Sequence, residues 1–404
     1  MNDGEFDISA LIRKCGTMKI LQVISYYNPK FGGDVNVCFH LSKELVKRHH
    51  EVTILTTDFG FDSEYADELR AYDVTIIPIP CIANFGLFLF SPAIKSWLEN
   101  NLKTFEIIHL HNYRSYQNAM VRAYAVKSGI PYILQAHGSV LPFFEKQNLK
   151  KIYDFVWGNN ILRDASTVIA LTQTEEEQYL KMGVPKNKIE IIPNGLDFTR
   201  FLHLPVKGEF RSKYNIPANA KMILFLGRIH RIKGIDLLLE AYIKLLKVLP
   251  ECQLVIVGPD DNYLSTLENQ IIKSGITKKP LITGPLFGDE KFSAFVDADV
   301  YVLPSHYETF SMGLLEAMYC GTPVIITNNI TDFDWIDQHT GFICNRDSED
   351  LKKCLYTILS DKKLRQSFGE NGKIIVSERF NFQNVVQSVI DLYYKSTNNT
   401  EYRR

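Results

Sequence analysis

Short apolar and β-branched runs alternate with amphipathic stretches along most of the chain, which is the pattern of parallel βαβ units. In the first half, such runs predict strands over residues 19–25, 51–56, 74–78, 107–111, 132–136, 167–171 and 189–192. Helical periodicity between them predicts helices over residues 35–49, 92–103, 116–127 and 174–182. The last of these helices has a start signal in Thr172 with Glu175 three positions later, and a stop signal in Gly183.

The periodicity lapses over residues 193–217, where three prolines and two glycines interrupt it, and then the same alternation restarts. It predicts a second set of strands over residues 222–226, 254–257, 281–283, 300–303 and 324–327. The predicted helices of this half cover residues 235–249, 262–274, 289–298 and 312–320, followed by two helical stretches that start near Ser348 and Phe382.

This pattern predicts an α/β protein of two Rossmann-like domains, each with a doubly wound parallel sheet. We expect the two domains to face each other across a central cleft, with the ligand at the carboxyl ends of the strands. The expected ranges are an N-terminal extension (1–17), a first domain (18–200), a second domain (201–380), and a C-terminal helix and tail (381–404) that pack back on the first domain.

Composition agrees with two globular domains and excludes several classes of protein. The chain has 404 residues, too many for one ordinary core, and its 45 basic residues nearly balance 46 acidic ones. We therefore expect no nucleic-acid partner.

Seven scattered cysteines without a CxxC pair indicate free thiols, and no secretory signal is visible at the N-terminus. Residues 74–94 carry no charge but contain three prolines, which favours a strand and loop over a membrane-spanning helix.

The usual nucleotide motifs are missing. No GxGxxG follows the first strand, which weighs against a dinucleotide-dependent dehydrogenase, and no GxxxxGK[ST] occurs. However, GRIHRIKG lies between a predicted strand and helix. Arg228 and Lys233 could converge there on an anion at the helix N-terminus; the alternative is two solvated charges beside a turn.

A second strand–loop–helix unit adds two carboxylates. Glu308 lies in the loop and Glu316 in the helix that opens near Ser311, so they could accept hydrogen bonds from sugar and ribose hydroxyls. The amides of residues 310–313 could meet phosphate. Two exposed glutamates on a surface helix are the alternative.

ETFSMGLLE resembles the EX7E signature of the retaining GT-B glycosyltransferases of group 1, also called GT4. GRIHRIKG is similar to the GRxxxxKG element of that family, and IIPNGLDFTRF to its IPNGVD segment. ADVYVLPS and the glycine pair after Phe31 also fit. These elements occur in the family's order between about residue 18 and about residue 390.

The resemblance implies a catalytic set of His137, Arg228, Lys233 and Glu308. Arg228 and Lys233 would neutralise the diphosphate of a nucleotide-sugar, Glu308 would hold hydroxyls of the donor sugar, and Glu316 would hold the ribose. His137 would lie on the cleft floor near the reacting sugar, with a satisfied histidine at a strand end as the alternative.

The resemblance also implies donor contacts through one loop of each domain. Backbone amides around Phe310, Ser311, Met312 and Gly313 would meet the distal phosphate or the sugar. Gly33 would let the first-domain loop approach the phosphates, since a side chain there would block that approach. The chain departs from the family's glycine-rich EGFG at Thr309 and Ser311, which makes the donor pocket more polar.

No metal site and no cofactor are expected. His109 and His111 form an HxH without a third ligand, which favours a structural or acceptor-lining role. Asp297 and Asp299 resemble a DxD metal motif, but Asp297 closes a predicted helix and Asp299 precedes a strand, so we expect them to cap and to be exposed to solvent.

By resemblance, the chain is a retaining hexosyltransferase that moves a sugar from a UDP- or GDP-linked donor to a hydroxyl of a glycan or lipid-linked glycan, in cell-surface polysaccharide or glycoconjugate synthesis. The alternatives are another GT-B activity, namely a nucleotide-sugar epimerase or a phosphorylase, and a non-catalytic sugar-nucleotide-binding protein.

We expect a cytoplasmic protein. Residues 141–157 combine five aromatic residues with three lysines (Phe143, Phe144, Tyr153, Phe155, Trp157; Lys146, Lys150, Lys151), a composition suited to the inner face of an anionic membrane. An ordinary amphipathic helix is the alternative.

Overall fold

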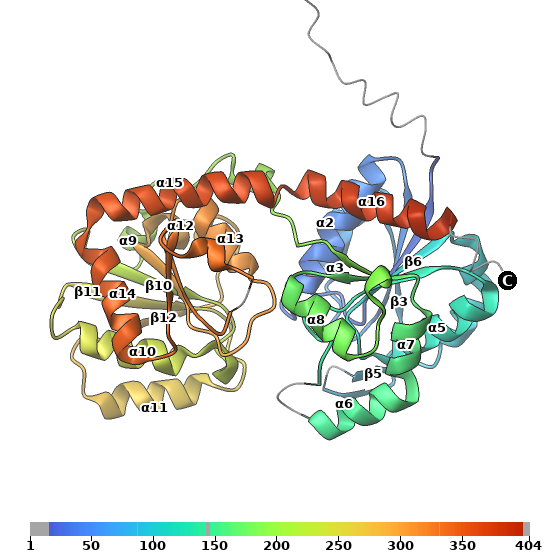
Figure 1. Ribbon diagram of the computed structural model, residues 1–404, viewed down its shortest axis with the longest axis horizontal. Coiled ribbons are helices and arrows are strands. Elements are labelled where there is room, and N and C mark those ends of the chain that lie inside the picture. Colours follow the sequence, from blue (N-terminus) through green and yellow to red (C-terminus); the bar gives the residue numbers. More distant parts are fainter. Residues whose placement is uncertain (1–15, 87, 143–145, 331, 399–404) are drawn as a thin grey trace, which may run out of the picture. The chain divides into compact units, whose positions relative to one another are not determined.

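The computed structural model describes residues 16–86, 88–142, 146–330 and 332–398 (Figure 1). It divides the chain into two compact units. Unit 1 takes in the chain up to Pro193 and again from Val385 onward, and unit 2 is the continuous stretch Asn194–Asn384.

Unit 1 is built on a seven-stranded sheet whose neighbours are all parallel, in the order β3-β2-β1-β6-β7-β8-β9. Its strands are β1 (Lys19–Val23), β2 (Glu51–Thr57), β3 (Thr75–Ile79), β6 (Ile107–His111), β7 (Tyr132–Gln135), β8 (Thr167–Ala170) and β9 (Ile189–Ile191). Its helices are α2 (Gly33–Lys47), α3 (Ser63–Arg70), α4 (Ile94–Asn101), α5 (Tyr116–Ser128), α6 (Gln147–Tyr153), α7 (Asn159–Asp164), α8 (Gln173–Lys181) and α16 (Phe382–Asn398). An antiparallel hairpin, β4 (Ala83–Phe85) with β5 (Phe88–Phe90), lies apart from the sheet.

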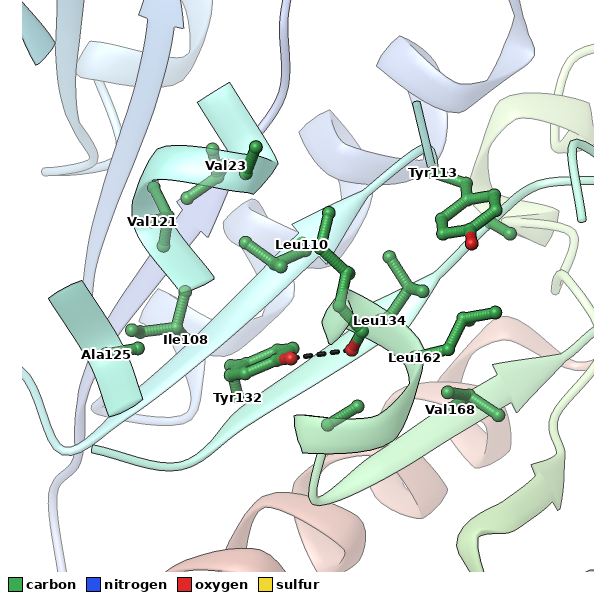
Figure 2. Close-up of a cluster of buried hydrophobic side chains, with 14 of the residues drawn as sticks. Val23, Ile108, Leu110, Tyr113, Val121, Ala125, Tyr132, Leu134, Leu162 and Val168 are labelled. Atoms are coloured by element: carbon green, nitrogen blue, oxygen red, sulfur yellow. Dashed lines mark hydrogen bonds between the residues drawn. The ribbon is translucent and has the colours of Figure 1, made fainter. Parts of the chain in front are cut away.

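The core of unit 1 fills the space between the central strands and α5 and α7 (Figure 2). Leu110, Leu134 and Val168 come from three successive strands and are fully buried. Tyr132 is also fully buried, and its hydroxyl donates to the backbone oxygen of Ile161 at 2.6 Å. The strands are continuous apolar runs because both faces of a parallel sheet are covered.

Unit 2 repeats the plan with six parallel strands in the order β12-β11-β10-β13-β14-β15. The strands are β10 (Lys221–Leu226), β11 (Cys252–Val257), β12 (Leu281–Gly284), β13 (Val300–Leu303), β14 (Val324–Thr327) and β15 (Gly341–Cys344). The helices are α9 (Glu209–Lys213), α10 (Ile235–Leu245), α11 (Leu264–Ser274), α12 (Gly288–Asp297), α13 (Met312–Tyr319), α14 (Ser348–Ser360) and α15 (Lys362–Arg379).

Every strand predicted from the apolar runs is present, but several other elements are not predicted. Helices α3 and α15 are mostly polar, and α3 buries only Ala66 and Leu69, so their periodicity is weak. Strand β15 begins at a glycine, and α6, α7 and the β4–β5 hairpin are short. The uncharged segment 74–94 forms β3 and this hairpin, and no described helix is long and apolar enough to cross a membrane.

In both sheets the order in which the chain adds strands reverses once, between β1 and β6 in unit 1 and between β10 and β13 in unit 2. In an open parallel sheet, such a switch point leaves a crevice at the carboxyl ends of the strands, where ligands bind. The loops after β1, β6, β10 and β13 are therefore where each unit can hold a ligand.

Candidate functional site

In unit 2, the loops after β10 and β13 are held against each other by close backbone packing. Gly234 has a left-handed φ of 65°, and a Cβ there would lie 2.1 Å from the backbone oxygen of Pro304, so the position requires glycine. The amide of His306 donates to the oxygen of Ile232 at 2.8 Å. These contacts fix the loop that carries Lys233 beside the loop that carries Glu308.

The side chains of Lys233 and Glu308 form an ion pair across these two loops. Lys233 Nζ lies 2.5 Å from Glu308 Oε2, and the side chains are 16% and 14% exposed. Partial burial strengthens such a pair relative to one in water. The structure thus brings together two residues of the expected catalytic set at the switch point of one sheet.

Helix α13 begins beside this pair. Ser311 caps it, since its side-chain oxygen accepts from the amide of Leu314 at 3.2 Å. Met312 and Gly313 lie in the first turn of α13. The backbone N–H groups of a first turn find no acceptor within their own helix, so these two can donate to an anion. The ring of Phe310 packs on Phe333 and Phe380 in the core of unit 2, which leaves only its backbone for ligand contact.

Glu316 is nearly buried on α13, and its carboxylate has a cationic partner. Lys291 Nζ lies 2.5 Å from Glu316 Oε2, and Arg200 lies 4.0 Å from Oε1. A ribose held by Glu316 would share the carboxylate with Lys291.

Arg228 follows β10, as expected, but its partner differs from that of Lys233. Its guanidinium pairs with Asp261, and its side chain is half exposed. The two cations of GRIHRIKG therefore contact two different carboxylates in this structure.

In unit 1, three polar residues gather at the carboxyl ends of β1, β6 and β7. Asn112 directly follows β6 and His137 lies two residues after the end of β7, and both have left-handed φ angles, of 64° and 51°. Asp34 Oδ2 accepts from Asn112 Nδ2 at 2.7 Å and from the hydroxyl of Tyr26 at 2.9 Å. Backbone strain at strand ends of this kind gathers at functional sites. Gly33, one residue before Asp34, is exposed, and a Cβ there would meet no atom within 4 Å, so the protein's own packing leaves this position open.

His137 contacts His111 of β6, which in turn contacts His109. His111 Nδ1 lies 3.0 Å from His137 Nε2, and the ring of His111 stacks on that of His109 at 4.3 Å. Burial lowers the pKa of His137 to about 4 and that of His109 to about 3, and burial and the two neighbouring imidazoles hold the pKa of His111 well below its usual range. All three rings are neutral near pH 7.

A buried carboxyl supports the loop that carries His137. The two oxygens of Glu175 accept from the amides of Gly138 and Leu171, each at 2.7 Å. Burial raises the pKa of Glu175 to about 7, although these two hydrogen bonds act in the opposite direction. Thr172 caps α8 as predicted, because its hydroxyl accepts from the amide of Glu175. The side chain of Glu175, in addition, accepts hydrogen bonds from the backbone that follows two strands, β7 and β8.

The DxD-like pair is structural, as expected, but it is not exposed. Asp297 is 1% exposed and accepts from the amides of Gly208 and Arg211. Asp299 pairs with Arg211 and Arg365. The expectation of solvent exposure is wrong because two backbone amides compensate the desolvation of Asp297 and two arginines compensate that of Asp299.

Only some of the aromatic side chains of segment 141–157 are exposed on the surface. Tyr153 is buried and Trp157 packs against the core of unit 1, so neither belongs to an exposed patch as expected. Phe143 and Phe144 lie outside the described residues. Phe155 is 83% exposed.

Sequence reasoning missed Asp34, Asn112, Lys291 and Gln22. Asp34 follows two glycines and Asn112 follows a strand, and both patterns could have indicated them. Lys291 and Gln22, which contacts His111, carry no local signal, since their partners are distant in sequence.

Two family models match the chain. The model of glycosyl transferases group 1 matches residues 206–374, within unit 2, and that of glycosyltransferase family 4 matches residues 31–200. Glycosyltransferase MJ1607 of Methanocaldococcus jannaschii is 25% identical, covering 93% of this chain and 98% of that protein. Mannosylfructose-phosphate synthase of Agrobacterium fabrum is 26% identical, covering 89% of this chain and 86% of that protein.

Solved structures show the same fold. The crystal structure of Anabaena Alr3699/HepE in complex with UDP-glucose matches with a TM-score of 0.78 at 19% identity, covering 94% of this chain and 100% of that one. Both units carry the parallel sheets of this fold. The chain therefore belongs to the group 1 (family 4) glycosyltransferases, and it is a transferase enzyme of the GT-B fold.

Proposed function

We propose that the protein is a retaining glycosyltransferase that moves a hexose from a nucleotide-sugar to a hydroxyl of a glycan or lipid-linked glycan. The observation that carries the proposal is the Lys233–Glu308 pair beside the first turn of α13. One cation, one carboxylate and free amides suit a diphosphate joined to a sugar. The UDP-glucose complex of the Anabaena protein supports a uridine nucleotide as donor, and a GDP-linked sugar is the alternative.

In the proposed reaction, the acceptor hydroxyl oxygen bonds to the anomeric carbon while the bond from that carbon to the β-phosphate oxygen breaks. The hydroxyl proton passes to the departing phosphate, on the same face of the sugar, so the anomeric configuration is retained. Lys233 and the amides of Met312 and Gly313 stabilise the charge that develops on the leaving diphosphate. Glu308 and Glu316 orient the donor through sugar and ribose hydroxyls, and Arg228 adds positive charge near the diphosphate.

The catalytic role of Lys233 is tested by Lys233→Ala in transfer assays with a panel of nucleotide-sugars. We expect a loss of about 2–4 kcal/mol in transition-state stabilisation, mostly in kcat. Lys273→Ala, an exposed lysine of α11, is the matched control and should keep full activity. Unchanged kcat in Lys233→Ala would refute the role, and tight donor binding without turnover in the parent would favour the binding-protein alternative.

We also propose that the reaction needs no divalent metal. In this proposal, Lys233 and the amides at the start of α13 do what a cation held by carboxylates does in other transferases. Activity should persist in EDTA, and proton NMR should show retention at the anomeric carbon. Loss of activity that Mg²⁺ restores, or an inverted product, would contradict this.

We propose a cytoplasmic enzyme of cell-surface glycan synthesis that contacts the inner face of an anionic membrane through unit 1. The β4–β5 hairpin and α6 lie together, since a Cβ on Gly86 would be 3.4 Å from Lys146 Nζ. These elements and the residues next to them expose apolar and basic side chains (Ile82, Phe85, Leu149, Ile152, Phe155; Lys146, Lys151). This combination suits an anionic leaflet.

Vesicle flotation tests the membrane contact. Replacing Lys146, Lys150 and Lys151 with serine should reduce binding to anionic vesicles and leave binding to neutral ones unchanged. The same change at Lys244, Lys247 and Lys273 of unit 2 is the control. If the first variant binds anionic vesicles like the parent, the proposal fails.

A further inference from the structure

A continuous chain of hydrogen bonds runs through three neighbouring strands of unit 1 and ends at His137. Gln22 lies on β1 and His111 on β6, and His137 lies two residues after the end of β7. His111 Nε2 is 2.6 Å from Gln22 Oε1, and His111 Nδ1 is 3.0 Å from His137 Nε2. Both ring nitrogens of His111 are therefore engaged within the protein.

The start of this chain is enclosed by the sheet. Gln22 and His111 are both fully buried at the centre of the parallel sheet, where β1 pairs with β6. Gln22 Oε1 also lies 3.5 Å from Cys38 Sγ, a thiol that burial keeps protonated and able to donate. Gln22 Oε1 accepts from the Cys38 thiol, so the carbonyl oxygen of this amide is the atom that faces both Cys38 and His111.

The three imidazoles of this region are neutral, so each has one N–H and one lone pair. Burial and the stacking of His109, His111 and His137 disfavour a charge on any of them. In a chain of neutral rings, the donor of each hydrogen bond determines the donor of the next. Since Gln22 accepts from His111 Nε2–H, His111 Nδ1 has the lone pair, and it accepts from His137 Nε2–H.

We infer that Gln22, acting through His111, sets the tautomer of His137, with the proton on Nε2 and the lone pair on Nδ1. Gln22 and His111 are thus positioning residues for His137, whose Nδ1 keeps the lone pair and can act as an acceptor. The catalytic consequence rests on the proposed function, but the tautomer itself does not. The left-handed backbone at His137 and the Glu175 contact to Gly138 hold the ring where His111 can reach it.

Removing the Gln22 carbonyl should move the proton. In Gln22→Met, an Nε2–H on His111 would be buried without an acceptor, which is unfavourable. The His111 proton instead has an acceptor only if it moves to Nδ1 and donates to His137 Nε2. His137 must then carry its own proton on Nδ1, the reverse of the parent.

The test is long-range ¹H–¹⁵N NMR of the full chain labelled at histidine nitrogens, which distinguishes protonated from unprotonated ring nitrogens. His137→Asn and His111→Asn assign the signals. Gln117→Met is the matched control, because Gln117 is equally buried in unit 1, is hydrogen-bonded to Ser25 and Leu89, and does not touch the histidines.

We expect an Nε2–H tautomer of His137 in the parent and in Gln117→Met, an Nδ1–H tautomer in Gln22→Met, and a kcat for transfer about tenfold lower in Gln22→Met only. A parent with the proton on Nδ1 would overturn the inference, even if Gln22→Met did not fold. An unchanged tautomer in folded Gln22→Met would overturn it as well. The spectra need no substrate, so failure of the proposed transferase reaction leaves this result intact.

Discussion

Replacing Glu175 with glutamine tests whether the buried carboxyl that supports the His137 loop makes the free energy of unfolding depend on pH. Glu175 is fully buried, and its two oxygens accept from the amides of Gly138 and Leu171. Glutamine keeps the shape of the side chain and removes its titration. The pH dependence of the stability difference between parent and variant therefore isolates this one group.

The magnitude follows from the folded and unfolded pKa values. Burial raises the pKa of Glu175 from 4.5 to about 7, so the folded protein binds a proton that the unfolded chain releases between these values. Protonated Glu175 thus adds stability that is full below the unfolded pKa and is lost as the pH rises through the folded pKa. At about 1.4 kcal/mol per pH unit, the parent should lose about 2.5 kcal/mol relative to Glu175→Gln between pH 5 and pH 8.

Urea unfolding followed by tryptophan fluorescence measures this difference in unit 1 alone. Trp97 and Trp157 lie in unit 1, and the third tryptophan, Trp335, lies in unit 2, so all variants are made in a Trp335→Phe background. Glu177→Gln, an exposed carboxylate on the same helix, is the control.

The reasoning is refuted if the parent and Glu175→Gln keep a constant stability difference from pH 5 to pH 8. It is equally refuted if the parent gains stability relative to the variant as the pH rises. A trend of the same size in Glu177→Gln would assign the effect to helix charge instead of the buried carboxyl.

Three further results are expected. Gly234→Ala should destabilise unit 2 by about 2–3 kcal/mol, because its Cβ would meet the Pro304 oxygen, whereas Gly275→Ala, with the same φ and open space, should cost about 1 kcal/mol in urea unfolding. Asp154→Asn should cost about 3–5 kcal/mol by the same measurement, because it leaves the buried guanidinium of Arg114 without its anion. Removing the N-terminal extension should shift Tm by no more than a few degrees, since β1 begins after it; a larger drop would show that the extension packs on the core.

The sequence predicts the sheets well because a doubly covered parallel strand must be a continuous apolar run. The strands of both units differ from the predicted ranges by at most a few residues. Polar helices such as α15 are not predicted because only one narrow face of the helix is buried, at Phe368, Gly369, Gly372 and Val376. The short strand β15 is not predicted because its apolar run has only three residues and follows a glycine.

The candidate site divides in the same way. Lys233 and Glu308 each lie in a strand–loop–helix unit, so local patterns and the family resemblance indicate both. The Lys291–Glu316 pair and the contact of Gln22 with His111 depend on which strands and helices are neighbours. Strand order is a property of the packed fold, and the period of a hydrophobic pattern carries no information on it.

The return of α16 to unit 1 has a consequence for how the chain folds as it leaves the ribosome. Tyr393 of α16 is fully buried, and its hydroxyl lies 2.7 Å from His109 Nδ1 at the centre of the unit 1 sheet. Unit 1 is incomplete until α16 has been synthesised, after all of the continuous unit 2 that precedes this helix. Domains usually complete their folding in the order of synthesis. Here the second unit can finish before the first, and His109 lacks its Tyr393 contact until α16 has been synthesised.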